Sequence, residues 1–219
     1  MILEVCCGSV ESVRAAIEGG AQRVELCREL SVGGVTPDDE MIRYAVENGI
    51  RAHVLIRCRA GNFVYTPEEV ERMCDEIRHV RELGVQGVVI GALTADGEID
   101  TETCRKWCEA AKGLSITFHR AFDECRHPEK ALEEIIALGC ERLLTSGQAA
   151  TAEEGTPLLR RLVKQARGRI LIMPGAGVSP KNAQRIIEET GAVELHGSLQ
   201  KKGCTDASMV REVVAIKSD

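Results

Sequence analysis

The sequence predicts a single (β/α)8 TIM barrel, an α/β fold, spanning residues 1–219 as one domain. Two observations carry this prediction. Short apolar runs recur along the chain at intervals of one strand–helix unit, and a glycine stands just before nearly every run. With the opening run there are eight strand candidates, at residues 2–6, 20–26, 49–56, 84–90, 113–118, 139–144, 168–173 and 191–196.

Each of these glycines follows a stretch with helical apolar periodicity, as in residues 131–138. Glycine adopts the left-handed conformation that commonly ends a helix, so the pattern predicts alternating helices and strands. A doubly wound open sheet is the alternative. It is less favoured because no Gly-x-Gly-x-x-Gly motif follows the first strand.

The predicted helix starts fit the same repeating strand–helix unit. A capping residue precedes proline at four places, which predicts helices beginning at the proline, and Thr66 with Glu69 forms a candidate capping box. Two aspartates are further candidate N-caps, one of them for a helix over 101–112. The predicted starts are at Thr36-Pro37, Thr66-Pro67, His127-Pro128, Ser179-Pro180, Asp100 and Asp206.

Composition narrows the class of protein. The net charge of −6 argues against a nucleic-acid partner or an anionic membrane surface. We expect no membrane span, since no run of 18 apolar residues occurs, and a cytoplasmic location, since the N-terminus lacks signal-peptide features. Ten cysteines without a Cys-x-x-Cys pair are expected to be mostly reduced and buried. A homodimer is the expected assembly.

The segment 115–123 is the most informative for function. A buried-strand pattern ends in His119, Arg120 and Asp123, and chemistry in parallel α/β folds lies at the C-terminal ends of strands. Other predicted strand ends add polar groups to the same rim. These are Glu4, Cys6, Glu25, Cys27, His53, Arg57 and His196.

Alternation along a strand puts Glu4 and Cys6 on one face, and likewise Glu25 and Cys27. Inward carboxylates need partners, and Arg57 and Arg120 are the candidates. Mutual neutralisation in the barrel core is the alternative reading of these charges.

Two glycine-containing turns near the last strands suggest an anion site. Ser146-Gly147 follows the sixth strand, and Gly175-Ala-Gly177 follows the seventh, ahead of a predicted helix start. Backbone N–H groups in such turns can hold a phosphate or carboxylate. A tight turn that simply requires glycine is the alternative.

The chain resembles the CutC family, whose members are named as copper homeostasis proteins. The resemblance runs nearly end to end. It rests on residues 4–6, 19–27, 33–37, 53–57, 117–123, 144–148, 172–178 and 196–198. It implies a TIM barrel, a cytoplasmic protein, and Cu(I) held by Cys6 and Cys27. Soft Cu(I) suits two thiolates in near-linear geometry, and Cys7 and Cys58 are nearby thiols that could join.

The sequence therefore leaves two candidate functions. The resemblance implies a copper-binding protein. The residues also suit a lyase, isomerase or hydrolase acting on a small anionic or phosphorylated metabolite. In that enzyme Glu25, His119, Arg120 and Asp123 would be catalytic. The anion would lie among Arg57, Ser146, Gly147, Gly175, Gly177 and His196.

Overall fold

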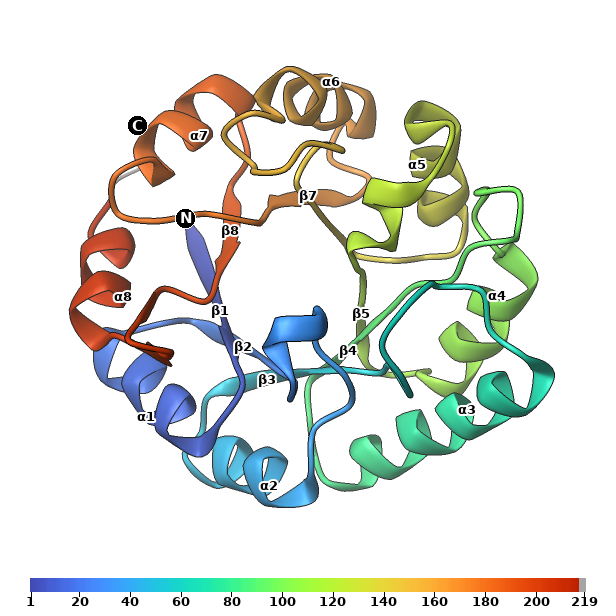
Figure 1. Ribbon diagram of the computed structural model, residues 1–219, viewed down its shortest axis with the longest axis horizontal. Helices are drawn as coiled ribbons and strands as arrows, with labels where there is room; N and C mark the ends of the chain where they lie inside the picture. The colour runs from blue at the N-terminus through green and yellow to red at the C-terminus, as the bar shows by residue number, and fades with distance from the viewer. Residues whose placement is uncertain (217–219) are drawn as a thin grey trace.

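Eight parallel strands form the inner ring of the molecule (Figure 1). The computed structural model describes residues 1–216. The strands lie in the order β7-β6-β5-β4-β3-β2-β1-β8, so the hydrogen-bonded ladder runs from β7 round to β8. Their bounds are β1 (Ile2–Cys7), β2 (Arg23–Leu26), β3 (Arg51–Leu55), β4 (Gly87–Ile90), β5 (Ser115–Phe118), β6 (Arg142–Thr145), β7 (Leu171–Pro174) and β8 (Glu194–Gly197). The predicted barrel and its eight strands are confirmed.

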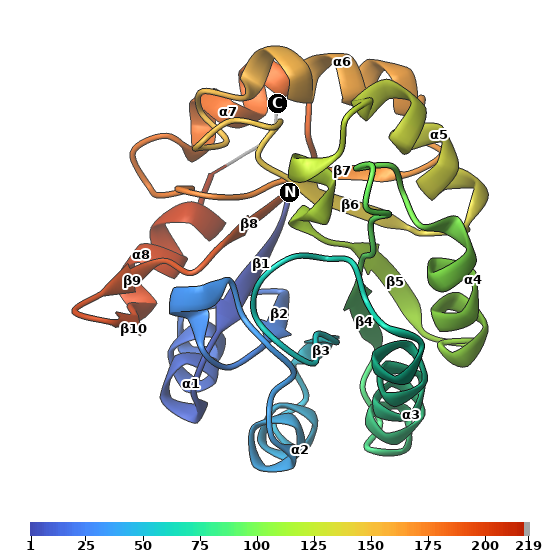
Figure 2. The same ribbon diagram turned by 45° about the vertical axis from the view of Figure 1, so that its right-hand side comes forward.

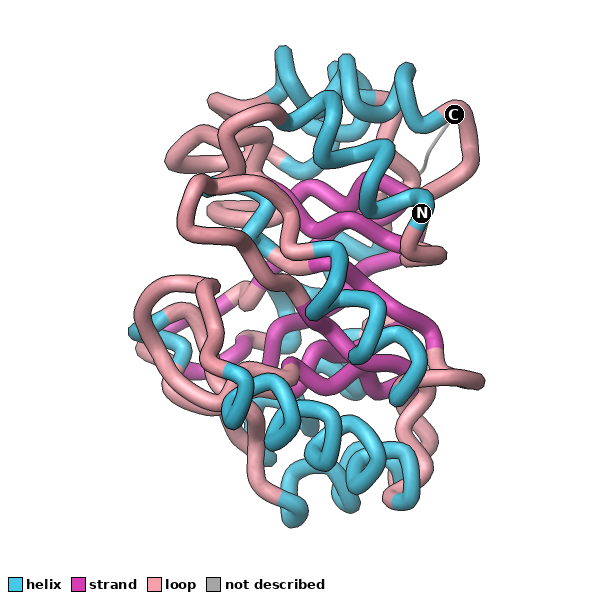
Figure 3. The backbone as a smooth tube through the Cα atoms, turned by 90° about the vertical axis from the view of Figure 1, so that its right-hand side faces the viewer, coloured by secondary structure: helices cyan, strands magenta, loops and turns pink. Residues whose placement is uncertain are grey.

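Helices cover the outside of this ring, and the longer loops gather on the side away from the N-terminus (Figure 3). That side holds the C-terminal ends of the strands, where the polar residues were predicted. The helices are α1 (Val10–Gly19), α2 (Asp39–Glu47), α3 (Pro67–Glu82), α4 (Thr101–Ala110), α5 (Pro128–Ala137), α6 (Thr156–Ala166), α7 (Ala183–Thr190) and α8 (Ala207–Val214).

Most predicted helix starts are found. Thr66 caps α3 in a full capping box with Glu69, and Asp100 and Asp206 cap α4 and α8. The start at Thr36-Pro37 is wrong, because α2 begins at Asp39 with Asp38 as its N-cap. The hydroxyl of Thr36 instead accepts from the Arg57 backbone N–H and donates to Glu76.

The start at Ser179-Pro180 is also too early. Helix α7 begins at Ala183, and the Asn182 side chain accepts from the backbone N–H of Ser179. The turn that contains Ser179 therefore precedes the helix and is held by an asparagine side chain. The helix after His127 does begin at Pro128, but the His127 side chain makes no capping bond.

The two faces of the strands differ in character. Outward residues such as Leu3, Val5 and Val24 belong to the apolar core between sheet and helices. Inward residues are largely polar. Glu4 pairs with Arg23, Arg23 pairs with Glu194, and Glu194 accepts from Arg142 at 3.0 Å. For Glu4, the expected partners Arg57 and Arg120 are thus replaced by Arg23, which is fully buried, whereas Glu25 accepts from the Cys6 thiol.

Short elements reach over the mouth of the barrel. The 3-10 helix η1 (Leu30–Val32) lies over the middle of the ring in Figure 1, and η2 (Arg120–Glu124) follows β5 directly. A hairpin of β9 (Gln200–Lys201) and β10 (Cys204–Thr205) projects beside α8 (Figure 2). Within residues 1–216, no helix has the length and apolar character needed to span a membrane.

Candidate functional site

Two thiols from neighbouring strands meet inside the mouth of the barrel. The Sγ atoms of Cys6, on β1, and Cys27, just after β2, are 3.6 Å apart, and both cysteines are free. Cys27 is fully buried and Cys6 is 6% exposed. They pack in a small apolar cluster with Leu55 and Val89 that is separate from the main core. The structure thus brings together the two cysteines that the resemblance singles out.

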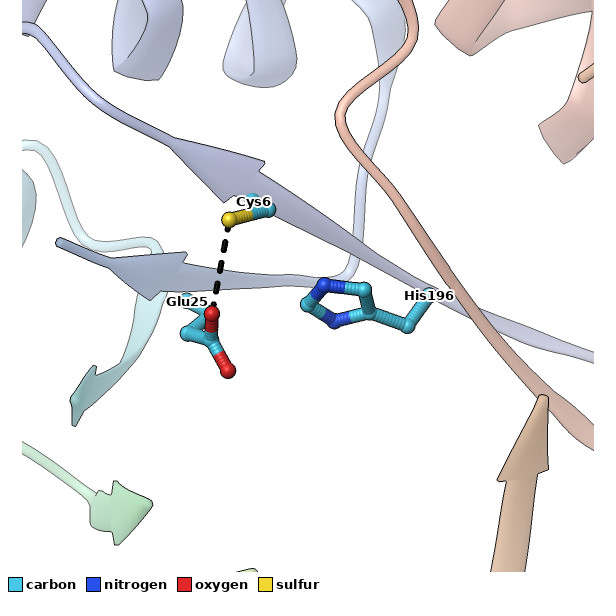
Figure 4. A group of neighbouring side chains, drawn as sticks. All are labelled: Cys6, Glu25 and His196. Atoms are coloured by element: carbon cyan, nitrogen blue, oxygen red, sulfur yellow. Dashed lines mark hydrogen bonds between the residues drawn. The ribbon is translucent and has the colours of Figure 1, made fainter. Parts of the chain in front are cut away.

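A carboxylate and an imidazole join Cys6 (Figure 4). The Cys6 thiol donates to Glu25 Oε1 at 3.3 Å. One atom each of Cys6, Glu25 and His196 lie within 4.8 Å of one another. The three side chains come from β1, β2 and β8, which are adjacent in the sheet. Thiol, carboxylate and imidazole are all metal-ligating groups, so this triangle is a candidate metal site.

Burial and neighbouring charges shift the proton affinities of this group. The hydrogen bond with Cys27, burial and the nearby Glu25 carboxylate raise the pKa of Cys6 well above its ordinary value. Burial also raises the pKa of Glu25, despite the opposing influence of His196. Both groups therefore favour their protonated forms relative to the same groups in water.

Glu4 lies below this triangle and orients His196. Burial alone would raise the pKa of Glu4, but the hydrogen bond with His196 and the charge of Arg23 hold it well below its usual range. Glu4 is thus a carboxylate, and His196 Nδ1 donates to Glu4 Oε1 at 2.8 Å. Burial opposes protonation of His196, yet Glu25 and Glu4 together raise its pKa.

His119 lies on the opposite wall, since β5 is four strands from β1 in the ladder. Its Nδ1 accepts from the Ala121 N–H at 3.1 Å, so the neutral ring carries its proton on Nε2. That Nε2 is buried without a partner. Burial, together with the charge of Arg57, lowers the pKa of His119 to about 3. A Cβ at Gly91 would come within 2.6 Å of the ring, so glycine there makes room for it.

Arg57 supports the loops at the mouth. Its guanidinium donates to the carbonyls of Val32, Gly34 and Gly61 at 2.7 to 3.0 Å. The side chain also contacts the ring of Phe63, with Cζ 4.8 Å from the centroid. Arg57 therefore ties the β2–α2 and β3–α3 loops together and adds a positive charge beside His119.

These groups enclose a pocket of about 240 Å³ that opens at the C-terminal ends of the strands. Seven of the predicted site residues line it: Cys6, Glu25, Arg57, His119, Arg120, His196 and, from the turn after β7, Gly177. Phe63, Leu30 and Ser198, which were not predicted, line it too.

The other five predicted residues lie outside the lining: Cys27, Asp123, Ser146, Gly147 and Gly175. Asp123 accepts from Thr145 Oγ1, from the Ser146 backbone and side chain, and from Arg120 Nε at 2.7 Å. Ser146 and Gly147 belong to the loop that Asp123 holds, and Gly147 abuts the backbone of Gly155. Asp123 thus positions Arg120 and the β6–α6 loop.

The turn after β7 combines close packing with unusual backbone conformations. A Cβ at Gly175 would lie 2.5 Å from Leu144, so the strand end needs glycine for space. Ala176 and Gly177 both have φ values near the left-handed region, 80° and 73°. Gly177 lines the pocket, whereas Gly175 lies behind it.

Two further thiols lie apart from the pair. Cys7 points to the outer face of β1, within the main apolar core, and its thiol donates to the Val5 carbonyl at 3.5 Å. Cys58 is half-buried in the loop after β3. Arg23, Arg142 and Glu194 were missed as interior residues. Their alternation with Glu25, Leu144 and His196 along β2, β6 and β8 was the available signal.

Comparison with known proteins identifies relatives along nearly the whole chain. The CutC family model matches residues 1–201. A CutC family protein of Pasteurella multocida is 52% identical over 197 residues, covering 90% of this chain and 81% of that protein. A CutC family protein of Bacteroides thetaiotaomicron is also 52% identical, over 215 residues, covering 97% of this chain and 86% of that protein.

Solved structures with the same fold include a member of this family. The crystal structure of CutC from Streptococcus agalactiae, a protein named for copper homeostasis, has a TM-score of 0.86 at 36% identity and covers 90% of this chain and 98% of that one. A thiamine phosphate pyrophosphorylase from Pyrococcus furiosus, at 17% identity and a TM-score of 0.65 over 97% of this chain and 93% of that one, shares the fold. On this evidence the chain belongs to the CutC family.

Proposed function

We propose that this protein binds Cu(I) through the thiolates of Cys6 and Cys27 and acts in copper homeostasis. The 3.6 Å approach of the two Sγ atoms is the observation that carries the proposal. Thiolates are the ligands that soft Cu(I) prefers. A reducing cytoplasm would keep both cysteines free, and we place the activity there.

The spacing of the thiols favours a bent arrangement with a third ligand over the near-linear one. With metal–thiolate bonds of about 2.3 Å, a separation of 3.6 Å corresponds to an angle of about 100° at the metal. A linear pair would require about 4.6 Å between the sulfurs. His196 and Glu25 lie within reach of Cys6 on the pocket side. Imidazole is the better ligand for copper, so His196 is the favoured third donor.

Metal binding must displace the thiol protons. Because the pKa of Cys6 is raised, this thiol is protonated at neutral pH and loses its proton only when the metal binds. Glu25 Oε1 already accepts the Cys6 S–H bond and is the nearest base to receive that proton. Glu25 therefore gives the proton a path from the buried thiol into the pocket.

A competition titration of reduced protein with Cu(I) against a strong chelator tests this proposal. We expect one equivalent to bind, and Cys6→Ser with Cys27→Ser to abolish that binding while the fold remains. Cys58→Ser with Cys204→Ser is the matched control, since both of these thiols are half-buried outside the pair. Equal binding by the two double variants would refute the thiolate site.

A second candidate is an enzyme acting on a small anionic metabolite in the same pocket. The Glu4–His196 pair favours it, because a buried carboxylate that orients an imidazole is a common arrangement for general acid–base chemistry. In this reading Glu25 and His119 are the other proton-transfer groups, and Arg120, positioned by Asp123, faces the substrate.

A further inference from the structure

A positive charge without an anionic partner lies at the mouth of the barrel. Arg57 is 5% exposed, and within residues 1–216 its guanidinium bonds to carbonyl oxygens but forms no ion pair. Carbonyl dipoles offset only part of the cost of burying such a charge. The nearby Tyr65 does not supply the missing charge, because burial raises its pKa to about 12. The site therefore favours an external anion.

A hydrogen-bond donor without an acceptor lies beside this charge. His119 is 5% exposed, and its Nε2–H has no partner in the described structure. The ring of Phe63 touches both residues, with its centroid 4.8 Å from Arg57 Cζ and 5.0 Å from the His119 ring. An unmet buried donor next to an uncompensated cation is suited to an acceptor oxygen that carries negative charge.

The opposite wall of the pocket has a hydrogen-bond acceptor without a donor. Glu25 Oε2 is buried without a partner on the β1–β2–β8 side of the same pocket. At about 30 Å³ for each water-sized group, the 240 Å³ volume accommodates about eight non-hydrogen atoms. A ligand that meets both walls needs an anionic group at one end and a hydroxyl at the other.

We infer that this pocket binds a small hydroxycarboxylate. Its carboxylate accepts from His119 Nε2–H in the field of Arg57 and Arg120, and its hydroxyl bonds to Glu25 Oε2. A carboxylate is favoured over a phosphate dianion because the acidic residue Glu25 lines the other wall, with the Glu4 carboxylate beneath it. The inference rests on the second candidate function and names its ligand class, and it does not depend on copper.

Entry of the ligand requires a small movement. The His119 Nε2 atom is covered from solvent, and Phe63, in the loop between β3 and α3, packs against the His119 ring. Phe63 is only half-buried, so its ring can shift toward solvent without opening the main core. Binding is therefore expected to move Phe63 and to leave the strands in place.

Two substitutions of His119 separate ligand binding from local structure. Asn retains an acceptor near the Nδ1 position, where the Ala121 N–H is bonded, but has no donor at the Nε2 position. Gln retains a donor near the Nε2 position but loses the bond to Ala121. His127→Asn, at the exposed start of α5, is the control.

The test is calorimetric titration of the metal-free, reduced full chain with glycerate, and with acetate and inorganic phosphate as comparison probes. We expect saturable binding of one glycerate. His119→Asn should weaken it about ten- to hundredfold, as loss of a hydrogen bond to a charged group does. His119→Gln should stay within about threefold of the wild type, and acetate, without a hydroxyl, should bind more weakly than glycerate.

Three results would overturn the inference. One is the absence of saturable glycerate binding. Another is a reversed order of the two variants, which would mean that the capping role of His119 explains its effect. The third is tighter binding of phosphate than of glycerate, which would mean that the pocket binds a phosphate group and not a carboxylate. Because the protein is free of metal throughout, failure of the copper proposal alone would leave these results unchanged.

Discussion

The floor and the mouth of the barrel are both polar, but they differ in how their charges are satisfied. On the floor, Arg23 joins Glu4 and Glu194, and Arg142 pairs with Glu194. At the mouth, His119 Nε2 and Glu25 Oε2 have no partner, and the thiols of Cys6 and Cys27 contact each other. The floor also has buried atoms without hydrogen-bond partners, Arg23 Nη1 and His53 Nδ1, so the difference lies in the ion pairs and in access to the pocket. Charges that are paired internally stabilise the fold, whereas groups without partners that line the pocket can bind a ligand.

The largest effect is expected when the buried cation of the floor, Arg23, is removed. Arg23→Leu would leave the buried carboxylates Glu4 and Glu194 without their shared cation and should lower the free energy of unfolding by about 3 to 5 kcal/mol. Denaturant unfolding monitored by circular dichroism measures this loss. Arg185→Leu, which removes the exposed pair with Glu153, should cost less than about 1 kcal/mol. Equal losses would remove the distinction between floor and surface charges.

Measuring unfolding over a series of pH values tests the comparison at His53, which lies at the edge of the floor. Burial lowers the pKa of His53 to about 4, against about 6.5 in the unfolded chain, so the unfolded state binds the proton more tightly. Stability from this group is complete above about pH 6.5 and is lost as the pH falls toward 4. His53→Gln should therefore reduce the loss of stability between pH 7 and pH 5 by about 2 kcal/mol.

The matched control for that series is His127→Gln, because His127 is exposed on the outside of the barrel. It removes an imidazole that is not buried, so a change shared by both variants would not be due to burial. A His53 variant whose curve parallels that of the wild type would show that the buried imidazole does not contribute to acid sensitivity.

A smaller effect is expected at the mouth. The raised pKa of Cys6 means that Cu(I) binding releases at least one proton, so the apparent affinity should rise about tenfold for each pH unit between pH 6 and pH 8. Chelator competition at fixed ionic strength, corrected for the chelator's own protonation, measures the slope. An affinity independent of pH would indicate ligands that are already deprotonated.

The sequence predicted the barrel well because its signals are local. Glycines end the helices, apolar runs mark the strands, and Thr66, Asp100 and Asp206 cap their helices as expected. The meeting of Cys6 with Cys27 followed from the resemblance and from strand alternation. Residue type and position in a unit were sufficient for these features.

The partners of the charged residues could not be predicted in the same way. Arg57 was expected to neutralise a carboxylate, but loop carbonyls of Val32, Gly34 and Gly61 surround it. Carbonyl acceptors occur at every residue, so sequence does not show which ones converge. Arg23 lies two residues before Glu25, so alternation puts its side chain inside the barrel, but only the register with Glu4 on β1 identifies its partner.

X-ray absorption at the copper edge of protein loaded with one equivalent of Cu(I) tests the central claim most directly. The account predicts two sulfur ligands, from Cys6 and Cys27, with a single nitrogen donor from His196 completing a bent site. A spectrum with only nitrogen and oxygen ligands would contradict it, as would an unchanged sulfur contribution in the protein carrying Cys6→Ser and Cys27→Ser.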